Sequence, residues 1–186
     1  MMKYDYIIWD FNGTLLNDVG ICVDCLNTLL KSHGMSEKTE EEYKKIFTFP
    51  IKEYYRRAGF DFDVTDYDTL AHEWTDYYRS RADLELFDGA EQTLKTLANR
   101  GLKQIIISAS EKNTLFEQTK ALGIDGYFSE MLGLDNIHAR SKEATAKDWR
   151  KRHPKAKAIF IGDTTHDKDV ADAIGADCLL IPNGHQ

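Results

Sequence analysis

Ile7-Ile8-Trp9-Asp10-Phe11-Asn12-Gly13-Thr14-Leu15 is the stretch that decides the fold. A short apolar run ends in Asp10, and Asn12-Gly13-Thr14 then supplies residues typical of turns and helix caps. Open α/β sheets build their sites at the carboxyl ends of strands, where a buried strand carries a polar side chain into a glycine-containing loop. The stretch therefore predicts a buried first strand with a site at its end.

From residue 84 onward, strand and helix patterns alternate. After a first strand at Tyr4–Trp9, the expected strands are Lys103–Ser108, Tyr127–Met131, Ala158–Ile161 and Cys178–Ile181. The expected helices are one opened by a capping box at Asp88-Gly89-Ala90-Glu91 and ending at Gly101, then Lys112–Leu122, Ser141–Arg152 and Asp167–Ile174. This alternation predicts the α/β class, with a doubly wound parallel sheet and helices on both faces.

Residues 17–83 break this rhythm because their patterns are all helical. The expected helices are Asp18–His33, Glu37–Phe47, Ile51–Ala58 and Asp66–Arg81. We therefore expect an α/β core domain of residues 1–16 and 84–186, with residues 17–83 inserted as an all-helical cap over the site. Cys22 and Cys25 form a C-x-x-C on the apolar face of the first of these helices, and we interpret them as core residues.

The composition limits the classes of partner. The chain has 186 residues, 42% of them hydrophobic, and a net charge of −7. Such a balance disfavours nucleic acid or an anionic membrane as the main partner. No apolar run is long enough to cross a membrane, and the first residues lack the layout of a signal peptide. Three cysteines favour a reducing compartment, so we expect a cytoplasmic protein. Nothing in the sequence requires more than a monomer.

Polar side chains stand where several of these strands end or helices begin. They are Asp10, Ser108-Ala109-Ser110, Lys142 and the stretch Gly162–Asp167. In a parallel sheet these points fall along one edge, which would then hold three carboxylates, a hydroxyl and an ammonium group. Carboxylates that otherwise repel can share a hard divalent cation such as Mg²⁺. The cation, the ammonium group and backbone N–H groups together suit a phosphate.

These motifs give the chain a resemblance to a known family. D-x-x-G-T-L at Asp10–Leu15 and G-D-x-x-x-D at Gly162–Asp167 resemble the haloacid dehalogenase superfamily, on its phosphoglycolate-phosphatase-like branch with a helical cap. The likeness runs nearly end to end. It implies a Mg²⁺-dependent hydrolase of small phosphorylated metabolites.

The resemblance also implies roles for individual residues. Asp10 would be the nucleophile, attacking phosphorus to form an aspartyl-phosphate. Ser108, with Ala109, would bind the phosphoryl oxygens. Lys142 would offset the charge of the nucleophile and hold the phosphate.

The same resemblance assigns the metal ligands. Asp10 and Asp163 would bind Mg²⁺ through their carboxylates, and Asn12 through its backbone carbonyl. Asp167 would bind metal waters or orient Lys142.

Asn12 departs from the family pattern, in which phosphatases have an aspartic acid that protonates the leaving oxygen and later deprotonates water. A neutral amide does neither, and such acid–base catalysis is worth roughly 10²–10⁴ in rate. Esters with good leaving groups need little protonation and would lose less in the first step. Hydrolysis of the aspartyl-phosphate would still lack its base.

Asn12 therefore leaves alternatives open. One is a weakly active or inactive protein with a binding or regulatory role, which binds a phosphate ligand. Another is a phosphonate hydrolase-like variant, which needs a cap lysine that forms a Schiff base; the candidates are Lys31, Lys38, Lys44, Lys45 and Lys52. Dehalogenases also lack the acid but use no metal, and Asp163 with Asp167 argues against them.

The loop Thr48–Lys52 is either a substrate-selecting segment or a plain connection, and we expect His166 to point to solvent.

Overall fold

A five-stranded parallel sheet forms the centre of the molecule in the computed structural model, which describes residues 3–136 and 141–186. Its strand order is β3-β2-β1-β4-β5, so the first strand is the middle one. The strands are β1 (Tyr6–Trp9), β2 (Lys103–Glu111), β3 (Glu130–Leu134), β4 (Ala158–Gly162) and β5 (Asp177–Leu180). The register places Trp9 of β1 opposite Ile106 and Ile161. Asp10, the next residue, therefore emerges between the ends of β2 and β4.

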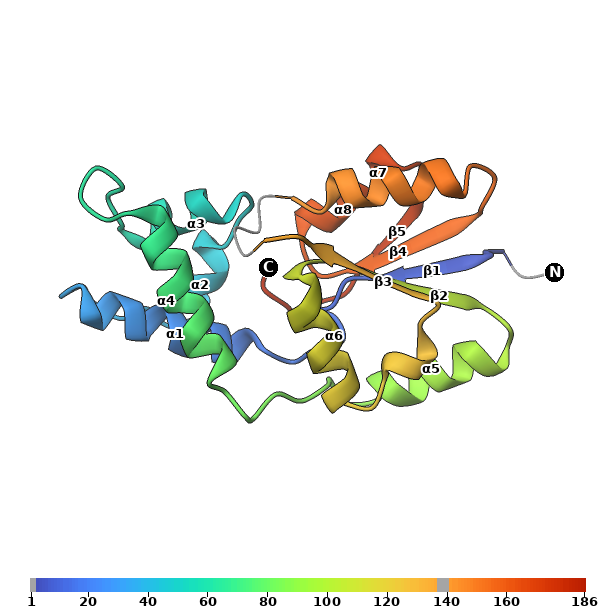
Figure 1. Cartoon of the computed structure of the whole chain (residues 1–186), viewed down its shortest axis with the longest axis horizontal. Helices are drawn as coiled ribbons and strands as arrows, with labels where there is room; N and C mark the ends of the chain where they lie inside the picture. The colour runs from blue at the N-terminus through green and yellow to red at the C-terminus, as the bar shows by residue number, and fades with distance from the viewer. Residues whose placement is uncertain (1–2, 137–140) are drawn as a thin grey trace.

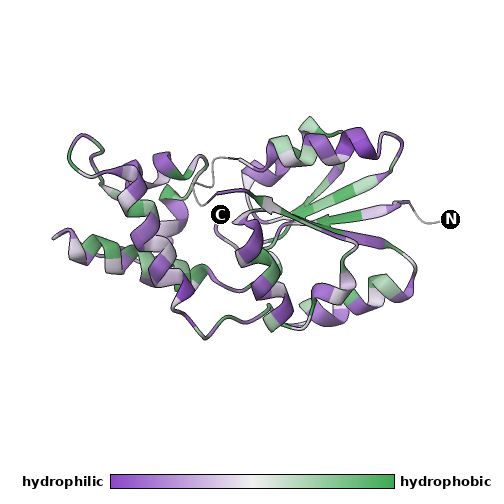
Figure 2. Ribbon diagram, in the orientation of Figure 1, coloured by the Kyte–Doolittle hydropathy of each residue, from purple (hydrophilic) through white to green (hydrophobic). Residues whose placement is uncertain are grey.

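Helices cover both faces of this sheet (Figure 1). On one face lie α5 (Ala90–Asn99) and α6 (Lys112–Ala121), and on the other α7 (Glu143–Arg152) and α8 (Thr165–Ala173). Alternate side chains of β1 face opposite ways, so Ile7 and Trp9 pack toward α5 and α6, while Ile8 packs toward α7 and α8. The strands accordingly appear as the hydrophobic centre in Figure 2. The predicted doubly wound α/β fold is confirmed.

Four helices lie between β1 and α5 in the chain: α1 (Val19–Ser32), α2 (Glu40–Ile46), α3 (Ile51–Ala58) and α4 (Tyr67–Arg79). We call them the cap. They share a hydrophobic cluster of their own, in which the free thiols of Cys22 and Cys25 are buried. The strands point their carboxyl ends toward the cap (Figure 1). The exact division into domains at residues 16 and 83 stays a prediction.

Several boundaries differ from those predicted. The capping box at Asp88–Glu91 is wrong, because the N-cap residue of α5 is Gly89, which is in a left-handed conformation and makes no side-chain cap. A real capping box joins Thr39 and Glu42 at the start of α2. β2 runs beyond Ser108 to Glu111 because its pairing with β3 shifts register between Ile107 and Glu111. β3 begins at Glu130, later than predicted, because a short 3₁₀ helix occupies Asp125–Tyr127.

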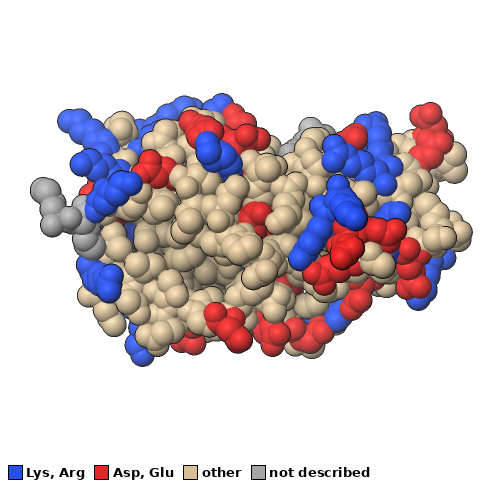
Figure 3. Space-filling view, turned by 180° about the vertical axis from the view of Figure 1, so that it is seen from behind, with Lys and Arg blue, Asp and Glu red and all other residues tan. Residues whose placement is uncertain are grey.

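The surface shows no concentration of basic residues on the face in Figure 3, where Lys and Arg are interspersed with Asp and Glu. Among the described residues, no helix combines the length and the apolar character needed to cross a bilayer.

Candidate active site

Asp10, Asp163 and Asp167 meet at the carboxyl edge of the sheet. Asp10 follows β1, Asp163 follows β4, and Asp167 lies in the first turn of α8. All three side chains are buried, and one oxygen of each lies within 4.8 Å of the others. The structure thus brings together three residues that are far apart in the chain, at the sheet edge where the sequence analysis expected them.

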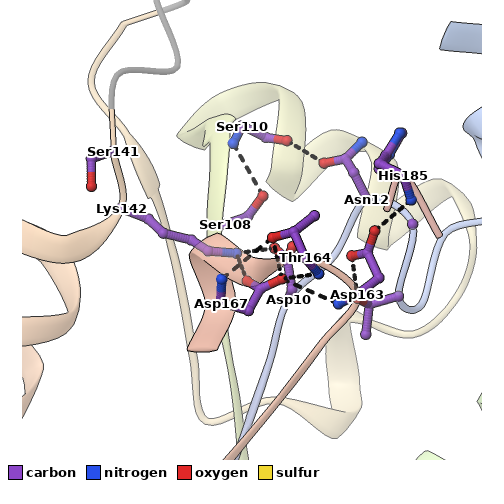
Figure 4. Close-up of polar contacts among 12 residues, drawn as sticks. Asp10, Asn12, Ser108, Ser110, Ser141, Lys142, Asp163, Thr164, Asp167 and His185 are labelled. Carbon is purple, nitrogen blue, oxygen red and sulfur yellow. Dashed lines mark hydrogen bonds and ion pairs between the residues drawn. The ribbon is translucent and has the colours of Figure 1, made fainter. Parts of the chain in front are cut away.

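Lys142, at the N-cap of α7, sits inside this carboxylate cluster (Figure 4). Its Nζ lies 2.5 Å from Asp10 Oδ1 and 2.6 Å from Asp167 Oδ1, and the residue is 1% exposed. Burial opposes its charge, but the two carboxylates outweigh burial and raise the pKa of Lys142. Lys142 is therefore a buried, charged ammonium group at a position where it can offset the charge of Asp10.

The carboxylates outnumber this one ammonium group. Burial, together with the charges of Asp167 and Asp163, raises the pKa of Asp10 to about 8, against the opposing effect of Lys142. Burial likewise raises the pKa of Asp163. Burial opposes ionisation of Asp167 too, but Lys142 and hydrogen bonds from Thr164 lower its pKa. The cluster thus has an excess of negative charge that a cation would offset.

The donor set fits a hard divalent cation. Carboxylate oxygens are the ligands of Mg²⁺, and three converge here. Asp163 is already fixed, since its Oδ1 accepts a hydrogen bond from Thr14 Oγ1 at 2.9 Å and its Oδ2 accepts one from the backbone N–H of His185 at 2.6 Å. Each oxygen still has a second lone pair available for a metal ion.

Glycine is required where the backbone approaches these carboxylates. Gly13 has φ +69°, and a Cβ there would lie 2.5 Å from Asp163 Oδ2 and 2.6 Å from His185 Cδ2. At Gly162 a Cβ would lie 2.3 Å from Asp167 Cγ. The glycines of the two sequence motifs therefore let the loops close around the carboxylates.

Asn12 is held by polar groups on several sides. Its Nδ2 donates hydrogen bonds to Asp18 Oδ2 at 2.7 Å and to the Tyr78 hydroxyl at 3.0 Å. Its Oδ1 accepts one from Ser110 Oγ at 2.6 Å. The side chain thus acts as a fixed amide with no proton to give, as its chemistry predicted.

His185 and Asp18 are site residues that the sequence analysis missed. The His185 Nδ1 lies 2.8 Å from the Tyr43 hydroxyl, and its Nε2 lies 3.4 Å from Asp18 Oδ1, so both ring nitrogens have partners. The ring also stacks on Phe47 at 4.8 Å. The signal was available in the topology, because His185 follows β5 and so comes to the same sheet edge as Asp163.

The charges of His185 and Asp18 stabilise each other. Burial alone would raise the pKa of Asp18, but hydrogen bonds from His185, Asn12 and Tyr78 outweigh it and lower the pKa. Burial alone would lower the pKa of His185, but Asp18 raises it. The buried carboxylate of Asp18 is therefore stably ionised and lies directly behind Asn12.

A cavity of about 160 Å³ opens from Asp10 toward the cap. Of the predicted site residues, Asp10, Asn12, Ser108 and Ala109 line it. Lys142, Asp163 and Asp167 pack around Asp10, behind this wall. Ser108 is buried, and its Oγ accepts a hydrogen bond from the backbone N–H of Ser110 at 3.0 Å, which shapes the turn at the cavity floor.

Two residues of the predicted loop Thr48–Lys52 line the cavity: Phe49, which lies in the loop, and Ile51, which begins α3. Phe49 stacks on His166 of α8 at 4.5 Å. The expectation that His166 points to solvent is wrong: its ring is half-buried because this cap loop covers the start of α8.

The cap lysines lie elsewhere. Lys31 pairs with Glu37, Lys44 pairs with Glu40, and the Lys52 Nζ lies over the rings of Phe62 and Tyr67. Among the described residues that line the cavity there is no lysine of the cap.

The comparisons with known proteins agree with this geometry. The family model described as haloacid dehalogenase-like hydrolase matches residues 7–181. A pyrophosphatase PpaX of Halalkalibacterium halodurans is 20% identical over 171 residues, covering 89% of this chain and 78% of that protein. A phosphoglycolate phosphatase of Synechococcus elongatus is 23% identical, with 96% and 84% covered.

Solved structures show the same fold. A haloacid dehalogenase-like family hydrolase of Streptococcus pneumoniae superposes with a TM-score of 0.80 at 21% identity, over 100% of this chain and 88% of that one. Protein Tyrosine Kinase A of Mycobacterium tuberculosis gives 0.84 at 21% identity, over 99% and 86%. With the family model spanning nearly the whole sequence, the chain belongs to the haloacid dehalogenase-like hydrolase family.

Proposed function

We propose that this hydrolase is a Mg²⁺-dependent phosphatase of small phosphorylated metabolites that works through an aspartyl-phosphate on Asp10. The observation that carries the proposal is the buried contact of Lys142 and Asp167 with Asp10, which itself lines a cavity. Relatives named phosphatases and a pyrophosphatase support the reaction class. We further propose that the protein acts as a cytoplasmic monomer, and that residues 17–83 form a cap domain that closes over the substrate.

The residues have distinct parts in this mechanism. Lys142 holds Oδ1 of Asp10, which leaves Oδ2 to attack phosphorus. A bond forms between that oxygen and phosphorus, and the bond from phosphorus to the leaving oxygen breaks. Ser108 and Ala109 line the cavity floor, where the Ser108 hydroxyl and the Ala109 backbone N–H can bind the phosphoryl oxygens. Water then hydrolyses the acyl phosphate and regenerates Asp10.

Asp10, Asp163 and the Asn12 carbonyl would hold the metal, with Asp167 acting through a water. A Mg²⁺ bound there supplies positive charge to the phosphoryl oxygens. Lys142 is the protein's own cation in the cluster, and it orients the nucleophile whether or not a metal is present.

Phosphate release from a panel of metabolite phosphates tests the proposal. We expect turnover with Mg²⁺, its loss in EDTA, and its loss in Asp163→Asn. Asp169→Asn is the matched control, because Asp169 is an exposed carboxylate of α8 outside the cluster. Full activity of Asp163→Asn in EDTA would contradict the metal site.

A second candidate is a phosphate-ligand binding or regulatory protein, and the fixed amide of Asn12 favours it. Steady release of many equivalents of phosphate supports the phosphatase. A burst of released alcohol that stops at one equivalent, with no release of phosphate, supports the binding protein, because Asp10 would react and the missing base would leave the phosphoryl group on it. The phosphonate-hydrolase alternative needs a lysine in the cavity, and among the described lining residues the cap supplies none.

A further inference from the structure

The cavity above Asp10 has aromatic walls. Its cap side includes Phe47, Phe49, Tyr54, Trp74 and Tyr78. Trp74 and Tyr78 stack on each other with their ring centres 4.8 Å apart, and both line the cavity. The volume is about 160 Å³, and an apolar cavity of roughly 150 Å³ is known to accept benzene. A single aromatic ring therefore fits between these walls in size and in chemistry.

The charges around the cavity disfavour a second anionic group on the substrate. The carboxylates of Asp10, Asp18 and Glu111 line it. Among the described lining residues the guanidinium of Arg79 is the one side chain with a permanent positive charge, and it is half exposed beside Glu111. Arg79 donates to Thr114 Oγ1 at 2.8 Å and lies 3.6 Å from Glu111. A leaving group with its own carboxylate would lose water beside three carboxylates and gain only this one cation, which already lies next to Glu111, so its burial is costly.

Asn12 points to the same kind of leaving group. An aliphatic alkoxide leaves poorly without a proton, since the parent hydroxyl has a pKa near that of water, about 15.7. A phenol has a pKa of about 10, so its phenolate leaves without an acid. In the step, Asp10 Oδ2 bonds to phosphorus while the bond to the aryl oxygen breaks. The electron pair stays on the phenolate, which takes its proton from water.

The Tyr54 hydroxyl adds a polar contact. Tyr54 is 3% exposed and lines the cavity, and its hydroxyl is one of the buried groups without a hydrogen-bond partner among the described residues. Buried hydroxyls nearly always have a partner. A polar substituent on the bound ring would supply it.

We propose that the substrate is a phosphate monoester of an uncharged aromatic alcohol, an aryl phosphate, held by the cap rings above Asp10. This inference rests on the proposed phosphatase function and names its substrate class. The aromatic lining and the missing acid are independent observations, one of shape and one of chemistry, and both select the same ester.

Two pairs of esters test it by kcat/KM with Mg²⁺. We expect phenyl phosphate to exceed 2-phosphoglycolate by at least roughly 10²-fold, the lower bound of what a missing acid costs. We expect 4-methylphenyl phosphate to exceed 4-carboxyphenyl phosphate, which differs in charge but leaves as a similar phenolate. A preference for phosphoglycolate, or for the carboxylated ring, would overturn the substrate class while leaving the phosphatase intact.

Binding of phosphonates that the enzyme cannot hydrolyse tests the aromatic site independently of catalysis. Phenylphosphonate and methylphosphonate cannot be hydrolysed in this way, and calorimetry with Mg²⁺ measures both. We expect the phenyl compound to bind at least roughly 10-fold more tightly, on the scale of specificity from apolar pockets. If no ester turns over, the phosphatase proposal fails, and this ratio alone decides the aromatic site. Equal binding would overturn it.

Variants in the cap locate the effect. We expect Trp74→Ala to lower the ratio of phenyl to methyl binding by roughly 10-fold. Tyr77→Ala is the matched control, since Tyr77 is an exposed aromatic of the same helix outside the cavity lining. Tyr54→Phe keeps the ring and should weaken only ring compounds with a polar substituent. An unchanged ratio in folded Trp74→Ala would contradict the proposed placement.

Discussion

The amide side chain of Asn12 suits its contact with the buried carboxylate of Asp18. Its Nδ2 donates to Asp18 Oδ2 at 2.7 Å, and Asp18 also accepts a hydrogen bond from the Gly13 backbone N–H at 3.0 Å. An aspartate at position 12 would put two buried carboxylates in that contact, and one would have to hold a proton. An amide at position 12 therefore donates a hydrogen bond that the Asp18 carboxylate accepts, which an ionised aspartate at this position could not do.

A single change should therefore restore a carboxyl group only at a cost in stability. We expect Asn12→Asp to lower stability, because the new carboxyl group must share a proton with Asp18. The double variant Asn12→Asp, Asp18→Asn keeps one amide and one carboxylate in contact but exchanges them. It should raise turnover of alkyl phosphates above both single variants, by up to roughly 10²–10⁴.

Steady-state kinetics on an alkyl and an aryl phosphate check this expectation. The gain should be smaller for the aryl ester, whose leaving oxygen needs no proton. Equal alkyl rates in the wild type and in the folded, metal-loaded double variant would show that position 12 does not limit the reaction.

Gly13 offers a test of how tightly the loop closes on the site. We expect Gly13→Ala to lower the free energy of unfolding more than Gly101→Ala does. Both glycines have positive φ, but a Cβ at Gly13 meets Asp163 and His185, whereas none lies within 4 Å at Gly101. The difference should be roughly 1–3 kcal/mol, the cost of overpacking. Urea denaturation measures it, and equal losses would mean that the loop relaxes freely.

The segment after β5 joins the core to the cap. His185 contacts Asp18, Tyr43 and Phe47, all within residues 17–83, while Gln186 Nε2 donates to the Phe47 carbonyl at 3.0 Å. The loop around Phe49 makes the second such connection through His166. Aromatic and hydrogen-bonded contacts together thus hold the cap over the cavity.

The His185–Asp18 pair predicts a pH dependence of stability. Contact with Asp18 outweighs burial and raises the pKa of His185 above its ordinary 6.5, so its contribution is complete below 6.5 and is lost as pH rises through the raised pKa. The pKa of Asp18 is lowered from 3.8, because hydrogen bonds outweigh burial, so its contribution is lost as pH falls below 3.8. The pair should stabilise most between pH 3.8 and 6.5.

Chemical denaturation of the wild type and His185→Gln across pH checks this. The difference in unfolding free energy should be about 3 kcal/mol within that window, the cost of leaving a buried charge unpaired. It should shrink as pH rises above the window. A difference that grows toward alkaline pH would have the wrong sign and would contradict the charged pair.

The arrangement of the sheet explains why much of the site was predictable. β1 lies between β2 and β4, so the residues at or near the carboxyl ends of these strands must meet, and the sequence marks them with Asp10, Ser108 and Asp163. Local patterns of apolar residues suffice to place such strand ends. The same rule would have found His185 after β5, had that short strand end been treated as a site position.

Other features depend on packing that no local pattern records. The network of Asn12, Asp18 and Tyr78 joins the core to α4, and the stacking of Phe49 on His166 joins a cap loop to α8. Which aromatic side chains turn toward the cavity follows from how the cap sits on the core. The capping box was wrongly assigned for a related reason, because the left-handed Gly89 starts α5 without a side-chain cap.

Reductive trapping tests the central claim that Asp10 carries the phosphoryl group. The enzyme is mixed with phenyl phosphate and Mg²⁺, quenched with borohydride and mapped by mass spectrometry, since an aspartyl-phosphate is reduced to homoserine. The account predicts homoserine at position 10, dependent on substrate and metal, and none in Asp10→Asn, which should also lack turnover. Phosphate release with reduction at another residue, or with none at any residue, would contradict it.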